Sequence, residues 1–331
     1  MNDRMCDFWD TLLRNERRAN KQKNNVELNQ KIITDLLETL CPEFPSKSIQ
    51  VHPFGSRILG MAGPDSDLDL YVDIGNSSAL YSETLTDKVI QEEKIITKAL
   101  QKNPSKWAFL ANVEGHCPVI VARHKNSNIQ CDISFSNSMI CGQSKLVIYI
   151  FELQPIARLM IIYLRGWVKE LQIQSAFRSH LLVLMVIFFL QVRGYLPTVY
   201  QFQDQLIPDV GPWITNFCKI KLSDFNMKTI PINANQTRKE LEDFFGYYST
   251  FNFSRMVICP YLGREVLRSK LKYLMPLRYR EYGYGTRFAG TPVAIQDLIH
   301  LSLNNATSIK ESDLDCFLEN CCKESNGFLK P

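Results

Sequence analysis

The chain has 331 residues, of which 45% are hydrophobic and 22% are charged, and its net charge is +4. These values are ordinary for a globular protein, and so small a net charge excludes a global field that would attract nucleic acid without a local surface. The length exceeds what a single core usually serves, so we expect two domains.

The ten cysteines are scattered along the chain without a C-x-x-C pair. This distribution argues against a structural zinc site and for a reducing compartment. Residues 1–10 contain no apolar signal-peptide core, and the longest apolar run, residues 181–190, is well short of the about 20 residues that cross a bilayer. We therefore expect a cytoplasmic protein that does not act at a membrane.

Four parts of the chain have a helical pattern. Residues 1–40 and 83–102 carry apolar positions at helical spacing, and each stretch is followed by a proline. Residues 146–164 are predicted to form an amphipathic helix with Pro155 near its middle. Residues 181–192 are apolar all round, so we expect a helix that is buried on every side.

The stretch from Val51 to Ile74 carries the first chemical signal. It is predicted to form a strand, a tight Gly-Ser turn and a second strand. In the second strand Asp67 and Asp69 alternate with leucines, so both carboxylates project from one face. Neighbouring carboxylates repel each other unless a cation lies between them, and Mg²⁺ uses such carboxylates together with phosphate oxygens.

Gly55 and Ser56 lie at the turn of this stretch. They offer backbone N–H groups and a hydroxyl, a combination that can hold a phosphate. An S-D-x-D segment can also be a loop with Asx-turns, and a Gly-Ser pair alone is common. Because both features occur together before a hydrophobic strand, they favour phosphoryl or nucleotidyl transfer.

A third carboxylate, Asp132, lies in the middle of a predicted strand at residues 129–135, after predicted strands at 107–113 and 118–124. A charge in such an apolar segment is costly without a partner. An arginine could be that partner. A two-metal site explains more, because a third aspartate on a neighbouring strand can hold one ion and assist deprotonation of an attacking hydroxyl.

Cations and aromatic rings are interleaved between residues 263 and 288. Cations follow phosphates and rings stack on unpaired bases, so this stretch is the best local candidate for an RNA surface. A solvated basic hairpin or helix face is the alternative. The basic residues are Arg264, Arg268, Lys270, Lys272, Arg278, Arg280 and Arg287, and the tyrosines are Tyr273, Tyr279, Tyr282 and Tyr284.

With the Gly-Ser turn, the D-x-D pair and the later aspartate, the sequence resembles the polymerase-β-like nucleotidyltransferases. Within them it is similar to the terminal nucleotidyltransferases that include cytoplasmic poly(A) and poly(U) polymerases. Landmarks of this group are matched, in the same order, by YLRGWVKE (163–170), SAFRSHLLVLMVIFFLQ (175–191), LEDFFGYY (241–248) and VAIQDLIHLSLNNA (293–306).

The resemblance implies a bilobal α+β fold. Residues 30–140 would form a nucleotidyltransferase catalytic domain with a small mixed sheet. Residues 1–29 and 141–331 would form a helical nucleotide- and RNA-binding domain of the poly(A)-polymerase-associated type, with the active site in the cleft between the two domains.

The resemblance also implies roles for individual residues. Asp67, Asp69 and Asp132 correspond to the catalytic aspartates that bind two Mg²⁺ or Mn²⁺ ions. The positions that correspond to nucleotide-binding residues are Gly55, Ser56, Gln143, Arg165, Lys169, Ser179, His180 and Asn304.

Several of these positions depart from the pattern of the group. Gln143 replaces an asparagine that contacts the sugar and base edge, and Arg165 replaces a lysine, so a planar fork replaces a point charge. His180 replaces a tyrosine that stacks on the base, although a histidine there could also be a cap or core residue. Leu303, followed by Asn304, replaces the histidine that favours uracil in uridine-adding relatives.

The resemblance thus implies a template-independent RNA terminal uridylyltransferase that adds UMP from UTP to RNA 3′ ends. A poly(A)-type adenylyltransferase with the same core is one alternative. An inactive RNA-binding scaffold is the other, although the complete aspartate triad argues against it. The chain has no RRM, KH or zinc-knuckle motif, so we expect a monomer that a protein partner recruits to RNA or to an exonuclease.

Overall fold

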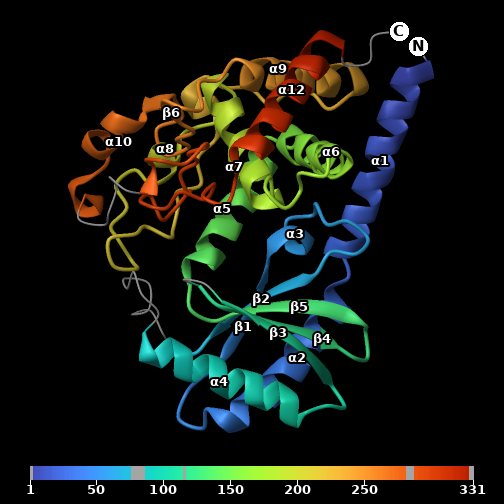
Figure 1. Ribbon diagram of the computed structural model, residues 1–331, viewed down its shortest axis with the longest axis vertical. Helices are drawn as coiled ribbons and strands as arrows, with labels where there is room; N and C mark the ends of the chain where they lie inside the picture. Colours follow the sequence, from blue (N-terminus) through green and yellow to red (C-terminus); the bar gives the residue numbers. More distant parts are fainter. Residues whose placement is uncertain (1–2, 76–85, 115–116, 281–286, 328–331) are drawn as a thin grey trace. The chain divides into compact units, whose positions relative to one another are not determined.

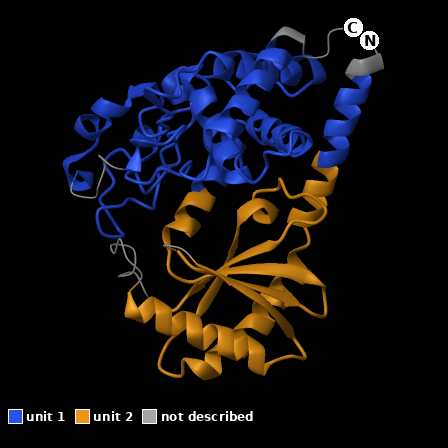
Figure 2. Cartoon of the chain, in the orientation of Figure 1, with its two compact units in different colours: residues 1–15, 146–331 blue, residues 16–145 orange. Residues whose placement is uncertain are grey.

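The computed structural model describes residues 3–75, 86–114, 117–280 and 287–327 (Figure 1). The chain forms two compact units, shown in Figure 2: the sheet unit, residues 16–145, and the helical unit, residues 1–15 together with 146–331. The functional division predicted from the sequence, residues 30–140 against the rest, remains a prediction.

The sheet unit is built on a mixed sheet of five strands in the order β1-β2-β5-β4-β3. β2 and β5 run parallel, and the other neighbouring pairs are antiparallel. The strands are β1 (Gln50–Phe54), β2 (Leu68–Asp73), β3 (Trp107–Val113), β4 (Val119–His124) and β5 (Ile129–Ser134). The predicted strands and the α+β class are therefore confirmed.

Helices α2 (Val26–Leu40) and α4 (Asp87–Lys102) cover one face of this sheet (Figure 1). Their apolar stripes, with Leu36 and Ile96 fully buried, join one core with Leu68 and Leu70 of β2. Because side chains alternate along a strand, the polar residues of β2 must project from the opposite face. Two short helices, η1 (Cys41–Glu43) and α3 (Gly55–Ile58), also belong to this unit, as do residues 16–23 of α1 (Asp3–Lys23) and 139–145 of α5 (Met139–Leu153).

A polar network anchors α2 to the edge of the sheet. The buried His124 Nε2 lies 3.0 Å from Asp35 Oδ2, and Lys106 Nζ lies 3.1 Å from Asp35 Oδ1. The indole N–H of Trp107 donates to Thr39 Oγ1 at 3.0 Å. These bonds satisfy polar groups that would otherwise be costly in the core, and they fix α2 against β3 and β4.

The helical unit has α7 (Ser179–Val192) at its centre. Every side chain from Leu181 to Gln191 is buried, as predicted from its uniformly apolar sequence. Helices α6 and α9 pack on α7, and α12 packs on α9. The elements of this unit are α1 (Asp3–Lys23, up to Asn15), α5 (Met139–Leu153, from Leu146), α6 (Ile156–Glu170), α8 (Val199–Phe202), η3 (Leu222–Phe225), α9 (Ala234–Ser249), β6 (Met256–Val257), β7 (Val266–Leu267), α10 (Arg268–Leu274), η4 (Leu277–Tyr279) and α12 (Glu311–Gly327).

The prediction of one helix across residues 146–164 is wrong. The chain breaks at Gln154 and Pro155, between α5 and α6. The side-chain amide of buried Gln154 donates to the carbonyls of Tyr195 and Lys228, each at 3.2 Å, and its Oε1 accepts from the Ile230 N–H at 2.8 Å. These long-range bonds hold the break at the residue before proline, where helical conformation is already disfavoured.

No single described helix is long and apolar enough to cross a bilayer, although α5 and α6 together have sufficient length and apolar composition as a sharply bent pair.

Candidate active site

The Gly-Ser turn lies between β1 and α3, where it meets the carboxylate of Asp69. Gly55 has φ = +72°, in the left-handed region that glycine adopts without strain. A Cβ atom at this position would lie 1.9 Å from Asp69 Oδ2. The backbone N–H of Ser56 donates a hydrogen bond to the same carboxylate. Glycine is therefore required here for two reasons, its backbone angle and the close approach of Asp69.

The sheet brings the three predicted aspartates together. Asp69 of β2 is paired in register with Asp132 of the parallel strand β5, so the two side chains leave the same face of the sheet from neighbouring strands. Asp67 immediately precedes β2, two residues before Asp69. The predicted alternation is confirmed, because Leu68 and Leu70 between and beyond them are fully buried on the other face.

Burial and mutual repulsion raise the pKa of all three carboxyl groups. For Asp69, burial and then the charges of Asp132 and Asp67 raise the pKa to about 7. Burial also raises the pKa of Asp67, with the charge of Asp132 as the next cause. Burial raises the pKa of Asp132 although Gln130 Nε2 donates to its Oδ1 at 3.1 Å. The fully charged cluster is costly without additional positive charge.

Arg57 is a residue of this site that the sequence analysis missed. It is only 4% exposed, and its guanidinium donates to the Ser66 carbonyl at 2.9 Å and to Gln22 Oε1 at 2.8 Å. Its charge favours ionised Asp67 and Asp69, while burial lowers the pKa of Arg57 itself. In the sequence, its position directly after the Gly-Ser pair could have indicated that it belongs to the site. Arg123 also lowers the pKa of Asp67, and these two arginines offset only part of the charge of three carboxylates.

The chemistry of the aspartates fits hard divalent ions. Carboxylate oxygens are the ligands that Mg²⁺ and Mn²⁺ prefer. Burial disfavours the ionised form of these carboxylates, and a bound cation would stabilise it. Within residues 3–75, 86–114, 117–280 and 287–327, no three or more His, Cys, Asp or Glu side chains are already grouped around one ion position. Side-chain rotation would therefore have to complete the coordination.

The other predicted nucleotide-binding residues are divided between the two units. Gln143 is partly buried in the part of α5 that belongs to the sheet unit. Arg165 and Lys169 lie four residues apart on α6 of the helical unit and so share one helix face. Ser179 and His180 are the first two residues of α7. The predicted cleft between the two domains stays a prediction.

His180 has a specific acidic neighbour within the helical unit. Its Nε2 lies 3.8 Å from Oδ2 of Asp297, which is buried. Oδ1 of Asp297 accepts the backbone N–H groups of Ile299 and His300, each at 2.9 Å, and its Oδ2 accepts from Asn305 Nδ2 at 2.9 Å. Burial acts to raise the pKa of Asp297, but the contact with His180 and these hydrogen bonds hold it well below its usual range.

The contact of Asn304 with the nucleotide stays a prediction, and its side chain is engaged within the fold. Asn304 is 2% exposed, and both ends of its side-chain amide are used within the fold. Its Oδ1 accepts from the Ile295 and Ala306 N–H groups, each at 3.0 Å. Its Nδ2 donates to Thr291 Oγ1 at 3.2 Å and to the Val293 carbonyl at 3.3 Å. Asn304 therefore holds the turn that presents Asp297.

The predicted basic surface contains residues of two kinds. Arg268 donates to four backbone carbonyls, those of Phe253, Phe288, Thr291 and Pro292, at 2.6–3.1 Å, so its guanidinium is engaged inside the fold. Arg278 donates to the Pro212 carbonyl at 3.1 Å and lies over the Tyr279 ring.

The remaining basic residues of this stretch are more accessible. Arg280 donates to the Tyr273 carbonyl at 3.2 Å but is exposed, and Arg287 is partly buried. Arg264, Lys270 and Lys272 are exposed. Tyr282 and Tyr284 lie outside the described residues.

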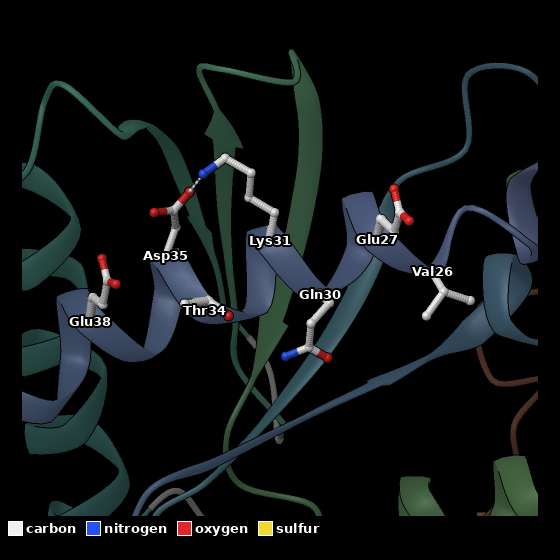
Figure 3. A pocket seen from close by; sticks show the side chains of 7 residues that line it. All are labelled: Val26, Glu27, Gln30, Lys31, Thr34, Asp35 and Glu38. Atoms are coloured by element: carbon white, nitrogen blue, oxygen red, sulfur yellow. Dashed lines mark ion pairs between the residues drawn. The ribbon is translucent and has the colours of Figure 1, made fainter.

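Two surface hollows lie away from the predicted site residues. Figure 3 shows one of about 520 Å³ along α2, where Lys31 and Asp35 form an ion pair of 3.5 Å. The second, of about 360 Å³, lies between α1 and α6. Neither is lined by a residue predicted to bind metal or nucleotide.

Comparison with known proteins gives the fold a family context. Residues 8–152 match the family described as the central palm domain of mitochondrial-like poly(A) RNA polymerase. Mouse (Mus musculus) mitochondrial poly(A) RNA polymerase is 23% identical over 327 residues, which cover 90% of this chain and 51% of the relative. Human (Homo sapiens) terminal uridylyltransferase 7 is 26% identical over 214 residues, which cover 62% of this chain and 13% of the relative.

The solved structures support the same fold. A structure of Cid1, described by its RNA terminal uridylyl transferase activity, matches with a TM-score of 0.66 and 19% identity, covering 92% of this chain and 88% of that chain. The chain spans about half the length, or less, of the curated relatives that it matches. The mixed sheet with helices is therefore a nucleotidyltransferase fold.

Proposed function

We propose that this chain is a template-independent RNA terminal nucleotidyltransferase of the polymerase-β-like kind, and more narrowly a uridylyltransferase; the match of residues 8–152 to a poly(A) RNA polymerase palm domain supports the broader proposal. The observation that carries the proposal is the in-register pair of Asp69 and Asp132, with Asp67 beside it and the Gly55–Ser56 turn against Asp69. Three carboxylates whose charge is disfavoured by burial and mutual repulsion form a costly arrangement that bound cations would stabilise.

The proposed reaction joins one nucleotide to the end of an RNA. The 3′-hydroxyl oxygen forms a bond to the α-phosphorus of a nucleoside triphosphate, the bond between the α-phosphorus and the bridging oxygen breaks, and diphosphate leaves. Asp67, Asp69 and Asp132 would hold two Mg²⁺ or Mn²⁺ ions, which supply positive charge to the phosphate and the attacking oxygen when bound. Gln130 holds one oxygen of Asp132, so the other oxygen is available to accept the hydroxyl proton.

The proposed triphosphate-binding residues are those that the resemblance assigned to this role. The Ser56 hydroxyl and the turn that it occupies would bind one phosphate, and Arg165 and Lys169 would neutralise the β- and γ-phosphates. Catalysis then consists of positioning and charge neutralisation, with little covalent work for the protein.

Support for uridine comes from the base-recognition residues and the motif pattern. His180 would stack on the base, and Asp297 fixes one edge of its imidazole ring. Gln143 would contact the sugar and base edge. The order of motifs resembles the insect terminal uridylyltransferase Tailor, whereas Leu303 stands where uridine-adding relatives have histidine. The side chain of Asn304 is engaged in the turn, so we expect the choice of uracil to come mainly from other residues.

Adenylate addition is a second candidate, because the mouse relative is a poly(A) polymerase by name. An inactive RNA-binding scaffold is a third, with the three aspartates as the argument against it. We also propose a cytoplasmic monomer that a protein partner recruits to RNA or to an exonuclease.

The test is extension of a labelled single-stranded RNA in Mg²⁺ with each nucleoside triphosphate alone and then in equimolar mixture. A ladder with UTP that persists in the mixture is expected, and Asp69→Ala should abolish it. Asp65→Asn, a change at an exposed carboxylate of the loop before β2, should leave it unchanged. A ladder mainly with ATP would reassign the nucleotide. No extension with any nucleotide, or full activity of Asp69→Ala, would refute the proposed nucleotidyltransferase activity.

A further inference from the structure

The hollow between α1 and α6 lies within the helical unit and has no role in the proposed reaction. Its volume is about 360 Å³. Its lining combines aromatic rings, carboxylates and small polar groups, and it contains no lysine or arginine. The lining residues are Asp7, Phe8, Thr11, Leu12 and Asn15 of α1, with Tyr163, Gly166, Trp167 and Glu170 of α6.

A glycine keeps this hollow open. Gly166 lies in the interior of α6, where glycine costs about 0.5–1 kcal/mol relative to alanine. No neighbouring element requires it, because a Cβ atom added there would meet no atom within 4 Å. The glycine therefore leaves space over the helix that almost any other side chain would occupy.

The aromatic part of the lining is held rigidly by the fold. The rings of Phe8 and Tyr163 meet edge to face with centroids 5.6 Å apart. Trp167 packs on Phe245 at 4.8 Å, and its indole N–H donates to Glu324 Oε1 at 3.3 Å. A ligand would therefore meet rings that are already in position, which limits the entropy cost of binding.

The charge around the hollow is negative and uncompensated. Asp7 and Glu170 line it and are exposed, and Glu324 stands behind Trp167. None of these three carboxylates forms an ion pair within the described part of the chain. Burial, and then the charge of Glu170, raises the pKa of Glu324, and burial followed by the charges of Glu324 and Glu170 raises the pKa of Tyr163. A cation placed here would relieve this repulsion.

The hollow also lies on a different face of α6 from the predicted triphosphate residues. Tyr163, Gly166 and Glu170 recur at spacings of three and four residues and share one face. Arg165 and Lys169 fall on another face of the same helix. A ligand in the hollow would therefore not compete with a nucleotide.

We propose that this hollow binds the arginine side chain of a partner protein. A guanidinium stacks on aromatic rings and forms paired hydrogen bonds with a carboxylate, which matches Tyr163 and Trp167 beside Glu170. A lysine ammonium is a compact, strongly hydrated charge and uses such a flat aromatic wall less well. The inference is independent of nucleotide addition, because it concerns a separate site and can be measured without activity.

The experiment titrates the full chain, labelled with ¹⁵N-tryptophan, with three blocked pentapeptides, Gly-Gly-Xaa-Gly-Gly, in which Xaa is Arg, Lys or Gln. The Trp167 indole signal is assigned by its loss in Trp167→Phe. The arginine peptide should shift this signal in a saturable way with a dissociation constant on the order of 1 mM, as suits a single side chain. The glutamine peptide should not shift it.

Three variants test the site itself. Glu170→Gln should weaken binding about tenfold, since it removes a charge-assisted contact. Gly166→Leu should fill the hollow and abolish binding while the fold is kept, because leucine favours the helix and has room. Glu319→Gln, a matched charge removal at an exposed position of α12, should have no effect.

The outcomes against the proposal are equally specific. Equal shifts with arginine and glutamine peptides, or none up to about 20 mM, would overturn it. Equal binding of lysine would overturn the assignment to arginine. Unchanged binding by Gly166→Leu, with the fold verified by circular dichroism, would show that the hollow is not the site.

Discussion

The charge cluster predicts that replacing Asp69 by asparagine stabilises the protein when no metal is present. The folded-state pKa of Asp69 is about 7, above the ordinary 3.8. A carboxyl group with a raised pKa costs nothing below its unfolded pKa, and the cost grows as pH rises toward the folded pKa. Stability should therefore fall between about pH 4 and pH 7 in the wild type. Asparagine carries no charge and can still accept the Ser56 N–H.

The magnitude follows from the shift of about three pKa units. Each unit corresponds to 1.36 kcal/mol, so the full cost at about pH 8 is about 4 kcal/mol, falling to about 1.5 kcal/mol at about pH 5. Local relaxation reduces both values, and we expect a measured gain of about 2–4 kcal/mol at the higher pH.

The assay is urea denaturation in EDTA at the two pH values, followed by far-ultraviolet circular dichroism. Asp65→Asn is the matched control, because Asp65 is exposed in the loop before β2, and it should change stability by less than about 0.5 kcal/mol. Mg²⁺ at ten times its dissociation constant should stabilise the wild type by about 1.4 kcal/mol and Asp69→Asn by much less. If Asp69→Asn stabilises the protein no more at the higher pH than at the lower, the charge of Asp69 does not destabilise the folded state and the reasoning is refuted.

Four further variants test other parts of the molecule. Gly55→Ala should cost about 1–2 kcal/mol through its left-handed backbone angle and, because the new Cβ displaces Asp69, should reduce nucleotide addition about 100-fold; normal activity would refute the close approach. Asp297→Asn should cost about 1–3 kcal/mol at neutral pH. Because the folded pKa of Asp297 is lowered, the stability difference between wild type and variant should shrink below about pH 4. Denaturation midpoints at two pH values measure it, and a difference that stays constant would contradict the reasoning. Arg268→Gln should cost about 3 kcal/mol or more, whereas Lys272→Gln should change stability by less than about 0.5 kcal/mol and lower the salt dependence of RNA binding by about one counterion. Equal stability losses for these two would contradict their assignment to interior and surface.

Much of the sheet unit could be predicted from local patterns in the sequence. The alternation of aspartate and leucine from Asp67 to Leu70 depends only on the geometry of a strand, so it predicts which face each side chain takes. The apolar run of residues 181–190 likewise predicts a buried helix, because no face of such a helix gains from water.

Other features of the site depend on contacts between distant parts of the chain. The register that pairs Asp69 with Asp132 requires the order of strands in the sheet, which no local periodicity encodes. The interior role of Arg268 depends on four carbonyls from two other segments. The burial of Asn304 depends on the fold of its turn, since an amide that binds a ligand and one that holds a loop look alike in sequence.

The sequence by itself determined the three carboxylates and the Gly-Ser turn, because these follow from residue type and short-range geometry, and the resemblance of its motifs to the nucleotidyltransferases implied the α+β class. Only the tertiary structure decided that Gly55 must make room for Asp69, that Arg57 shares the charge of the site, and that Gly166 opens a hollow on α6. The physical reason is the same in each case: burial and close approach are properties of the packed chain, and they appear only when residues far apart in sequence meet.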